Sequence, residues 1–158
     1  MPLFDRCAEC RRCCNVDRGA PPLEITLTSE EHRQFGRLCI DRECRFLGEA
    51  GCVLGDSKPF SCNLYPLSYK PLTGLFYYDA ECPLMPDYIA QLAKPQSEAS
   101  QHLAQAHERL RELQQSDPEF LDRNFAVDTR YFKLRRLPRP AGGGAKAWLR
   151  RAFRAKLG

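Results

Sequence analysis

The stretch Cys7-Ala8-Glu9-Cys10-Arg11-Arg12-Cys13-Cys14 decides how the fold of this 158-residue chain is interpreted. Its two-residue gaps let one loop turn several thiols toward a common point, and thiolates are soft ligands that suit zinc or iron–sulfur centres. Cys13 and Cys14 are adjacent, and adjacent side chains diverge in an extended backbone. We therefore expect the pair to serve two neighbouring centres, unless one of the two thiols does not bind metal.

All nine cysteines lie in the first 82 residues. Cys44, Cys52, Cys62 and Cys82 lie at hairpin and loop positions, where we expect them to supply further ligands. No apolar run precedes Cys7, and none approaches the roughly 20 residues needed to cross a bilayer, so neither a secretory peptide nor a transmembrane segment is expected. We therefore expect a cytoplasmic protein, in which closely spaced thiols favour metal binding or catalysis; disulfides and unliganded core thiols stay open as alternatives.

Short secondary-structure elements are predicted around these cysteines. Residues 1–18 show no helical or strand period and are interpreted as a ligand-bearing loop. Alternation over 23–27 predicts a strand, and the capping-box pattern Thr28-Ser29-Glu30-Glu31 predicts a helix to about residue 38. Turn signals predict two hairpins, which pair 45–47 with 52–54 and 67–69 with 75–78. Such small elements cannot bury a conventional core, so the cysteines are the available cross-links.

Beyond residue 86 the composition is that of a helical protein. Helices are predicted over 87–93 and 97–116, and Asp117-Pro118 is typical of a third helix start. An apolar stripe on the long helix is expected to pack on the cysteine module; its members are Ala99, Leu103, Ala106, Leu110 and Leu113. The predicted fold class is α+β. Residues 1–86 are predicted to form a small metal-stapled, cysteine-rich module with short hairpins, backed by helices over 87–136. A Pro/Gly linker and a basic C-terminal helix or tail are predicted over 137–158.

Positive charge is concentrated in the C-terminal segment. Residues 130–158 carry 10 basic and no acidic side chains, although the net charge of the whole chain is only +4. The pattern over 145–157 predicts a basic amphipathic helix with Trp148 and Phe153 on its apolar side. Such a helix suits an anionic partner, which would be nucleic acid, a membrane surface or an acidic protein. The alternatives are that it packs back on the domain or is a disordered solubilising tail.

Several motifs together resemble the YkgJ-like CxxCxxCC cysteine-cluster family, which is described as zinc- or iron-chelating. They are the opening over 7–14, the Thr28-x-x-Glu31 helix start, Cys44-Arg45-Phe46-Leu47 before Cys52, and Lys58-Pro59-Phe60-Ser61-Cys62-Asn63-Leu64-Tyr65-Pro66. The family pattern has Arg, Arg and Phe where this chain has Lys58, Asn63 and Tyr65. The resemblance covers residues 7 to about 83. A related branch includes a flagellin lysine N-methylase, and some members are labelled iron–sulfur oxidoreductases, but neither activity transfers to this chain.

The resemblance leaves Cys39 as a ninth cysteine outside the ligand set. The predicted metal ligands are therefore Cys7, Cys10, Cys13, Cys14, Cys44, Cys52, Cys62 and Cys82. Four thiolates around Zn²⁺, or around an iron–sulfur cube of formal charge about +2, leave a net charge of about −2. Five arginines could offset this charge and donate hydrogen bonds to sulfur, or could simply be solvated: Arg6, Arg11, Arg12, Arg42 and Arg45.

No catalytic residue can be assigned from the sequence. His32, His102 and His107 all lie on predicted helices, where a histidine is more often a surface or packing residue than a ligand. The leading hypothesis is a cysteine-cluster protein that binds zinc or iron, an iron–sulfur cluster included. Two alternatives stay open, namely an iron–sulfur oxidoreductase or protein-modifying enzyme, and a zinc-stabilised nucleic-acid or protein interaction module.

Overall fold

The computed structural model describes residues 3–139 of the chain. Its helices, with 3-10 helices written η, are η1 (Leu3–Asp5), α1 (Arg6–Cys10), η2 (Arg12–Cys14), α2 (Ser29–Phe35), η3 (Gly55–Ser57), α3 (Phe60–Leu64), α4 (Met85–Gln91), α5 (Glu98–Ser116) and α6 (Pro118–Tyr131). Its strands are β1 (Leu23–Glu24), β2 (Cys39–Ile40), β3 (Leu47–Gly48), β4 (Gly51–Cys52), β5 (Leu67–Lys70), β6 (Leu75–Asp79) and β7 (Leu134–Arg136). This mixture of helices and small sheets confirms the predicted α+β class.

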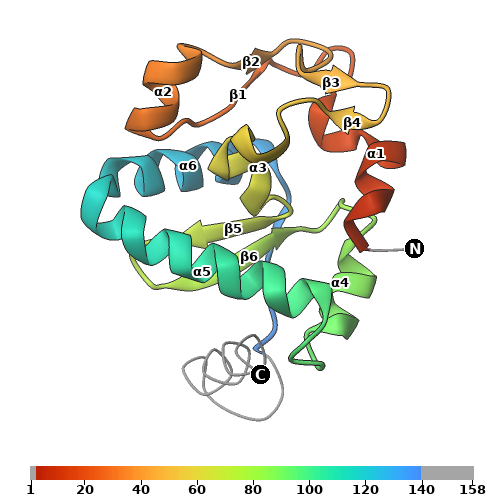
Figure 1. Ribbon diagram of the computed structural model, residues 1–158, viewed down its shortest axis with the longest axis vertical. Helices are drawn as coiled ribbons and strands as arrows, with labels where there is room; N and C mark the ends of the chain where they lie inside the picture. Colours follow the sequence, from red (N-terminus) through yellow and green to blue (C-terminus); the bar gives the residue numbers. More distant parts are fainter. Residues whose placement is uncertain (1–2, 140–158) are drawn as a thin grey trace.

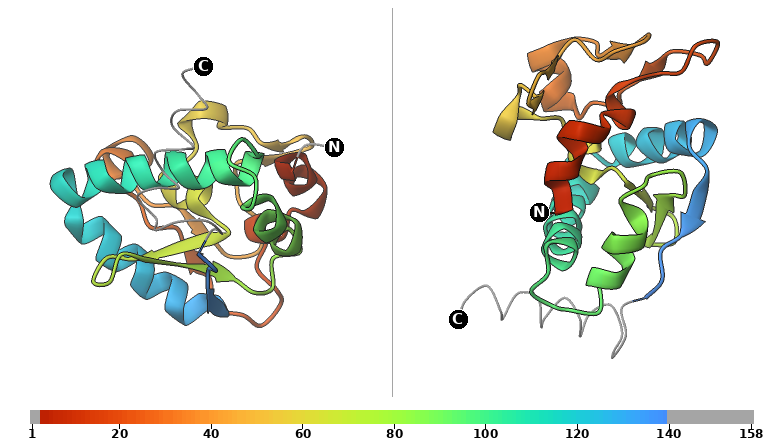
Figure 2. Two further views of the ribbon diagram at one scale, coloured as in Figure 1. Left: turned by 90° about the horizontal axis from the view of Figure 1, so that it is seen from below. Right: turned by 90° about the vertical axis from the view of Figure 1, so that its right-hand side faces the viewer.

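The central element is a three-stranded antiparallel sheet with the order β5-β6-β7. Helix α6 packs against β5, and α5 packs against both α6 and α4. The strand pairs β1-β2 and β3-β4 form separate two-stranded ribbons, which together with α2 make up one end of the molecule, whereas α4 lies toward the other end (Figures 1 and 2). Among the helices of residues 3–139, none is both long and apolar enough to span a membrane.

The main hydrophobic core lies between the sheet and the helices. The predicted stripe of α5 is buried in full: Ala99, Leu103, Ala106, Leu110 and Leu113. It belongs to one cluster with Phe60 and Leu64 of α3, and with Phe120 of α6, whose side chain has no exposed surface. One buried cluster therefore contains residues of both predicted segments, 1–86 and 87–136.

The end of the molecule that carries α2 and the two ribbons buries little apolar surface of its own. Its separate cluster contains Val16, Leu23 and Ile40 as buried residues, and Leu27 and Leu38, which flank α2, are buried as well. Burying five such side chains contributes about 1.5–3 kcal/mol each. Fixing a residue's backbone costs roughly 1–2 kcal/mol, and this end contains a long run of loop. Apolar burial alone therefore does not account for its order.

Side-chain caps fix two helices at the predicted positions. Glu31 N donates to Thr28 Oγ1 at 3.2 Å, and Thr28 N donates to Glu31 Oε2 at 2.9 Å, which completes the capping box of α2. The other oxygen, Glu31 Oε1, accepts from Phe60 N at 2.7 Å. The cap thus ties α2 to α3, the helix that carries Cys62. Asp117 caps α6 by accepting from Phe120 N.

Some predicted elements are corrected by the structure. Residues 1–18 are not a plain loop, because they contain α1 and η2, separated by Arg11 in the left-handed region at φ 53°. The helix predicted to residue 38 ends at Phe35, since Gly36 takes φ 71°. The predicted strand 23–27 is reduced to β1, because its partner β2 is equally short. The linker after residue 139 and the predicted helix 145–157 lie outside the described residues.

Candidate metal centre

The eight predicted ligands line two adjoining cavities. A cavity of about 370 Å³ is lined by Cys7, Cys10, Cys13 and Cys82. A cavity of about 70 Å³ is lined by Cys14, Cys44, Cys52 and Cys62, and also by Cys13. We call Cys7, Cys10, Cys13 and Cys82 the first set, and Cys14, Cys44, Cys52 and Cys62 the second set. Cys13 and Tyr65 line both cavities, whereas Cys39 lines neither.

The first set is assembled by local helices and one distant turn. Cys7 and Cys10 lie on α1, and Cys13 lies on η2, so the left-handed turn at Arg11 bends this short segment back on itself. Cys82 follows β6, where Cys82 N donates to Asp79 O at 3.1 Å. The chain therefore brings a residue 69 positions away to the same cavity as Cys13.

The second set is drawn from four separate elements. Cys44 N donates to Cys14 O at 2.8 Å, so η2 lies directly beside the loop after β2. Cys52 pairs with Leu47 across the β3-β4 ribbon, and Cys62 lies on α3. Close packing supports this arrangement, since a Cβ on Gly51 would lie 3.5 Å from Ala8 Cβ. These contacts are long-range in sequence and depend on the tertiary fold.

The vicinal pair does not have the predicted extended backbone. Cys13 and Cys14 lie in a 3-10 turn, and the Cys13 thiol donates a hydrogen bond to the sulfur of Cys14. This bond lowers the pKa of Cys14 and raises the pKa of Cys13, because it stabilises the thiolate of the acceptor. The prediction of an extended backbone with diverging side chains at Cys13 and Cys14 is therefore wrong. The two thiols still differ in place, because Cys14 lines only the smaller cavity and Cys13 lines both.

Burial and one lysine dominate the electrostatics of the other thiols. Burial raises the pKa of Cys62 to about 12, and it also raises the pKa of Cys7 and Cys82. The positive charge of Lys58 acts in the opposite direction and lowers the pKa of Cys7 and Cys62. Lys58 also lines the smaller cavity. Without a further positive charge, these thiols hold their protons at neutral pH.

The arginines near the motif contact carboxylates, backbone carbonyl groups and an aromatic ring. Arg6 pairs with Asp87, and Arg11 donates to the carbonyl oxygens of Ala8 and Glu49. Arg45 lies over the Phe46 ring, with its guanidinium carbon 4.8 Å from the ring centroid. Two of the arginines still act on sulfur through their charge: Arg11 lowers the pKa of Cys14, and Arg45 lowers the pKa of Cys44.

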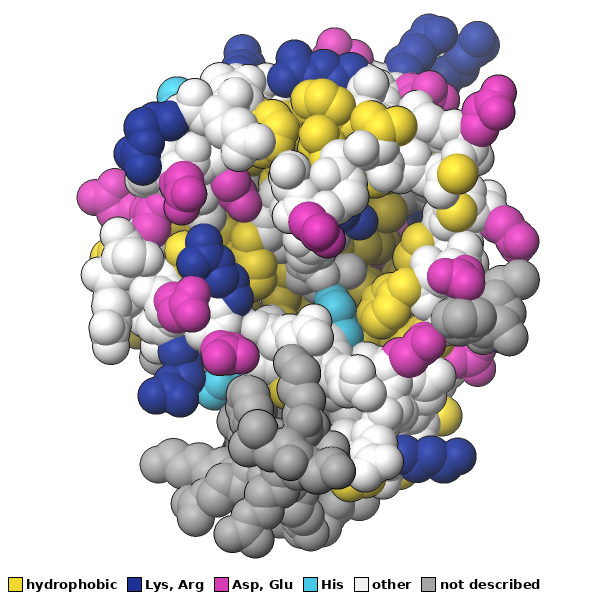
Figure 3. Space-filling view, in the orientation of Figure 1, with side chains coloured by type: hydrophobic (Ala, Val, Ile, Leu, Met, Phe, Trp, Pro, Cys, Tyr) yellow, Lys and Arg dark blue, Asp and Glu magenta, His cyan; other side chains and the backbone are white. Residues whose placement is uncertain are grey.

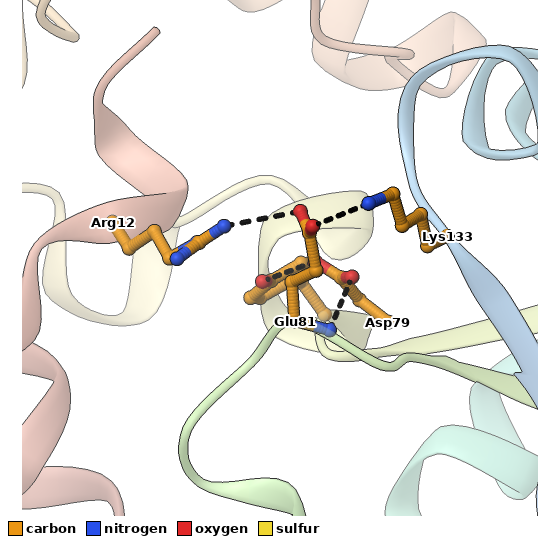
Figure 4. Close-up of polar contacts among 5 residues, drawn as sticks. Arg12, Asp79, Glu81 and Lys133 are labelled. Atoms are coloured by element: carbon orange, nitrogen blue, oxygen red, sulfur yellow. Dashed lines mark hydrogen bonds and ion pairs between the residues drawn. The ribbon is translucent and has the colours of Figure 1, made fainter. Parts of the chain in front are cut away.

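A polar network holds the Cys13 turn near Cys82 (Figure 4). Glu81 accepts from Arg12 Nη2 and from Lys133 Nζ, each at 3.0 Å. Asp79 accepts from Glu81 N at 3.0 Å and from the Tyr65 hydroxyl at 2.8 Å. The network therefore links η2, the turn after β6 and the segment after α6. Because the ion pairs are exposed, each contributes little to stability, and their effect is to position the two cysteines.

Sequence reasoning missed part of this site. In the sequence, Lys58 and Tyr65 are distinguished only as departures from a family pattern, yet both line the smaller cavity. Asp79 and Glu81 were not singled out, although an acidic pair immediately before a cysteine is a visible signal. His102 is a packing residue, because its ring nitrogens lie 2.8 Å from Tyr88 Oη and 2.6 Å from Asn63 O.

The donor chemistry of the two sets suits a soft metal, but the side chains are spread around the cavities. Within residues 3–139, no three His, Cys, Asp or Glu side chains form a group that could hold a metal ion. The cysteines in this range are also free of disulfides. Comparisons with protein-family models, with curated proteins and with solved structures find no match. Metal binding and the family resemblance therefore stay predictions.

Proposed function

We propose that the protein binds zinc or iron, an iron–sulfur cluster included, through two neighbouring sets of four cysteine thiolates. The observation that carries the proposal is the division of the eight predicted ligands between two adjoining cavities. Four thiolates complete a tetrahedral zinc site or hold one iron–sulfur cluster. With Cys13 assigned to the first set, each cavity has the number of ligands that one such centre requires.

A bound cation would change the protonation of the thiols. Metal ligands must be deprotonated, whereas burial raises the pKa of Cys7, Cys44, Cys62 and Cys82. A metal cation at this place would reverse the cost of burial by stabilising the thiolates. Lys58, which lies among them, reduces the remaining negative charge.

The end of the molecule that carries α2 and the two ribbons has only a small core of its own. A metal bound there would therefore have a structural role. A metal held by the second set would cross-link η2, the loop before β3, β4 and α3. A metal held by the first set would join α1 and η2 to the turn after β6. Both centres would thus fasten the end of the molecule that carries the two ribbons to the main core, and metal binding would contribute directly to the folding free energy.

Elemental analysis and visible absorption of anaerobically purified protein test this proposal. We expect stoichiometric zinc or iron, and iron in a cluster would colour the protein brown. Cys10→Ser and Cys52→Ser should each lower the metal content by about half, because each changes one set. Cys39→Ser is the matched control and should leave it unchanged. Protein that folds fully without metal, with all thiols free, would overturn the proposal.

A redox function is the second candidate, and the larger cavity favours it. This cavity is about 370 Å³ in volume, and both Cys7 and Cys10 at its wall are exposed. The face drawn in Figure 3 is also hollowed near its middle, beside α3, and hydrophobic-class side chains, which include cysteine and tyrosine, line the hollow. A brown protein that bleaches reversibly on reduction would support an iron–sulfur oxidoreductase. Colourless stoichiometric zinc would exclude it.

A further inference from the structure

A broad groove lies between α6 and the segment that leads from Pro21 through β1 to α2, which is drawn above α6 in Figure 1. Its volume is about 660 Å³, within the range of about 300–1,000 Å³ that is typical of small-molecule sites. It shares some residues of the β1 segment with the smaller cysteine cavity, but no cysteine of residues 3–139 lines it. The groove is therefore a separate candidate site that metal ligation does not explain.

The charged side chains that line the groove are mostly cationic. They are Arg37, Arg123 and Arg130, with Glu24 as the carboxylate, and the groove is also lined by His32. Glu24 already has a partner, because its two oxygens accept from Nε and Nη2 of Arg37, each at 3.1 Å. The positive charges of Arg123 and Arg130 are therefore not balanced by a carboxylate that lines the groove.

These two arginines also form no ion pair with the described residues. Arg123 Nη2 donates to Leu27 O at 3.4 Å across the groove, and Arg130 Nε donates to a carbonyl oxygen of its own helix at 3.3 Å. A guanidinium has five N–H donors, so most of the donors on both side chains are available to a ligand. Two carboxylates act on or respond to lining residues, Asp17 and Asp117, but neither lines the groove.

The spacing of the two cations defines the shape of a matching ligand. Arg123 and Arg130 are seven positions apart on α6. Seven residues of α-helix rise about 10.5 Å and return to the same face. Between the arginines, Ala126 and Val127 of α6 line the groove, together with Ile25 of the opposite wall. The groove thus has two cationic points with an apolar stretch between them.

We propose that this groove binds a small organic dianion in which an apolar body holds two carboxylates about 10 Å apart, one for Arg123 and one for Arg130. Guanidinium and carboxylate pair through two parallel hydrogen bonds. The apolar stretch between the arginines contacts the body of the ligand, which a compact ion such as phosphate would leave unused. This site goes beyond the metal-binding function proposed above and does not require that the cysteines hold metal.

Biphenyl-4,4′-dicarboxylate is a suitable probe, because it is rigid and its carboxyl carbons lie roughly 10 Å apart. Since its body is rigid, it loses little conformational freedom on binding. Biphenyl-4-carboxylate has the same body and one charge fewer. At the ordinary efficiency of small ligands, about 18 non-hydrogen atoms give the dicarboxylate an expected Kd of about 0.1 mM.

The test is a titration of isotopically labelled, anaerobically purified protein, followed by NMR. We expect shifts of the Ile25 and Val127 amide signals and contacts between the ring protons and the Val127 methyl groups. Biphenyl-4-carboxylate should bind about three- to tenfold more weakly, because one guanidinium loses its carboxylate. Equal affinity of the two compounds would overturn the proposal, as would the absence of these contacts up to about 5 mM dicarboxylate, far above the expected Kd.

Two variants test the role of each arginine. Arg123→Gln and Arg130→Gln should each lower the affinity for the dicarboxylate to about that of the monocarboxylate. Both side chains are exposed, so we expect both variants to fold. Arg135→Gln, at an exposed position on β7 outside the groove, is the matched control and should bind as the wild type does. An equal loss of affinity in Arg135→Gln would indicate a general effect of charge and overturn the proposal.

A hexaglutamate peptide tests whether the groove instead takes an acidic protein segment. The peptide lacks the apolar body, so we expect it to bind more weakly than the dicarboxylate. Tighter binding of the peptide would assign the groove to an acidic segment and overturn the proposal.

Metal analysis of the same samples keeps this proposal separate from metal binding. We expect Arg123→Gln and Arg130→Gln to retain the metal content of the wild type, because no predicted metal ligand lines the groove. Protein that is purified without metal but binds the dicarboxylate through both arginines would refute the proposed function and support this inference. Protein that contains metal but does not bind the dicarboxylate would do the reverse.

Discussion

Replacing Asp128 by Asn should make the stability of the protein less dependent on pH. Burial among α6, β5 and the cavity wall raises the pKa of Asp128 to about 7, from an ordinary value of 3.8. The folded protein therefore keeps this proton up to a higher pH than the unfolded chain does. Because the unfolded chain binds fewer protons between these two values, the free energy of unfolding falls as the pH rises from about 4 to about 7.

The size of the effect follows from the shift. Each pKa unit corresponds to about 1.4 kcal/mol, so the full shift would cost about 4 kcal/mol once the carboxyl is ionised. Relaxation and water entry reduce this cost, and we expect about 2–4 kcal/mol. Asn keeps nearly the same shape and can still accept from Ser68 Oγ. The stability of Asp128→Asn relative to the wild type should therefore rise by this amount between pH 4 and pH 8.

Urea unfolding of both proteins at a series of pH values measures this difference. Titration of the cysteines and release of metal affect both proteins alike, so they cancel when the free energies are subtracted. Asp122→Asn is the matched control, because it replaces an exposed carboxylate on the same helix. A difference between Asp128→Asn and the wild type that does not change with pH would refute the reasoning, since Asp128 would then be ionised in the folded protein as in the unfolded chain.

Three further predictions concern the core, a cap and the metal. Phe120→Ala should destabilise the protein by about 3–5 kcal/mol in urea unfolding, because this ring is fully buried; a loss below about 1 kcal/mol would contradict the described core. Thr28→Ala should cost about 1 kcal/mol, whereas the exposed neighbour Ser29→Ala should cost less, and equal losses would contradict the capping box. Chelation should increase amide hydrogen exchange in β1–β4 while α5 stays protected; uniform exchange in both would show that the metal does not fasten that end.

The parts of the fold that are encoded locally could be predicted from the sequence. The α5 stripe repeats every three or four residues, and Asp117-Pro118 has the chemistry of a helix start, so both can be predicted from the sequence. The hairpin of β5 and β6 likewise has strands of adequate length around a clear turn. Each of these signals lies within about 20 residues of sequence, where periodicity and turn chemistry act.

The rest depends on contacts between distant residues or on unusual backbone. The helix α1 ends because Arg11 adopts a left-handed conformation, and the neighbouring residues do not predict this conformation. The hydrogen bond between Ser68 and Asp128 joins residues 60 positions apart, so neither residue marks a site by itself. The Cys13-Cys14 pair predicts two neighbouring centres, and this stays a prediction. Which cysteine lines which cavity depends on the tertiary fold.

The most direct test of the central claim is X-ray absorption at the metal edge of the protein as purified without oxygen or chelator. The two-set arrangement predicts four sulfur ligands for each metal ion, at about 2.3 Å. Iron in clusters would add a second shell of neighbouring iron atoms. A metal surrounded mainly by nitrogen or oxygen, or a folded protein without bound metal, would contradict the account.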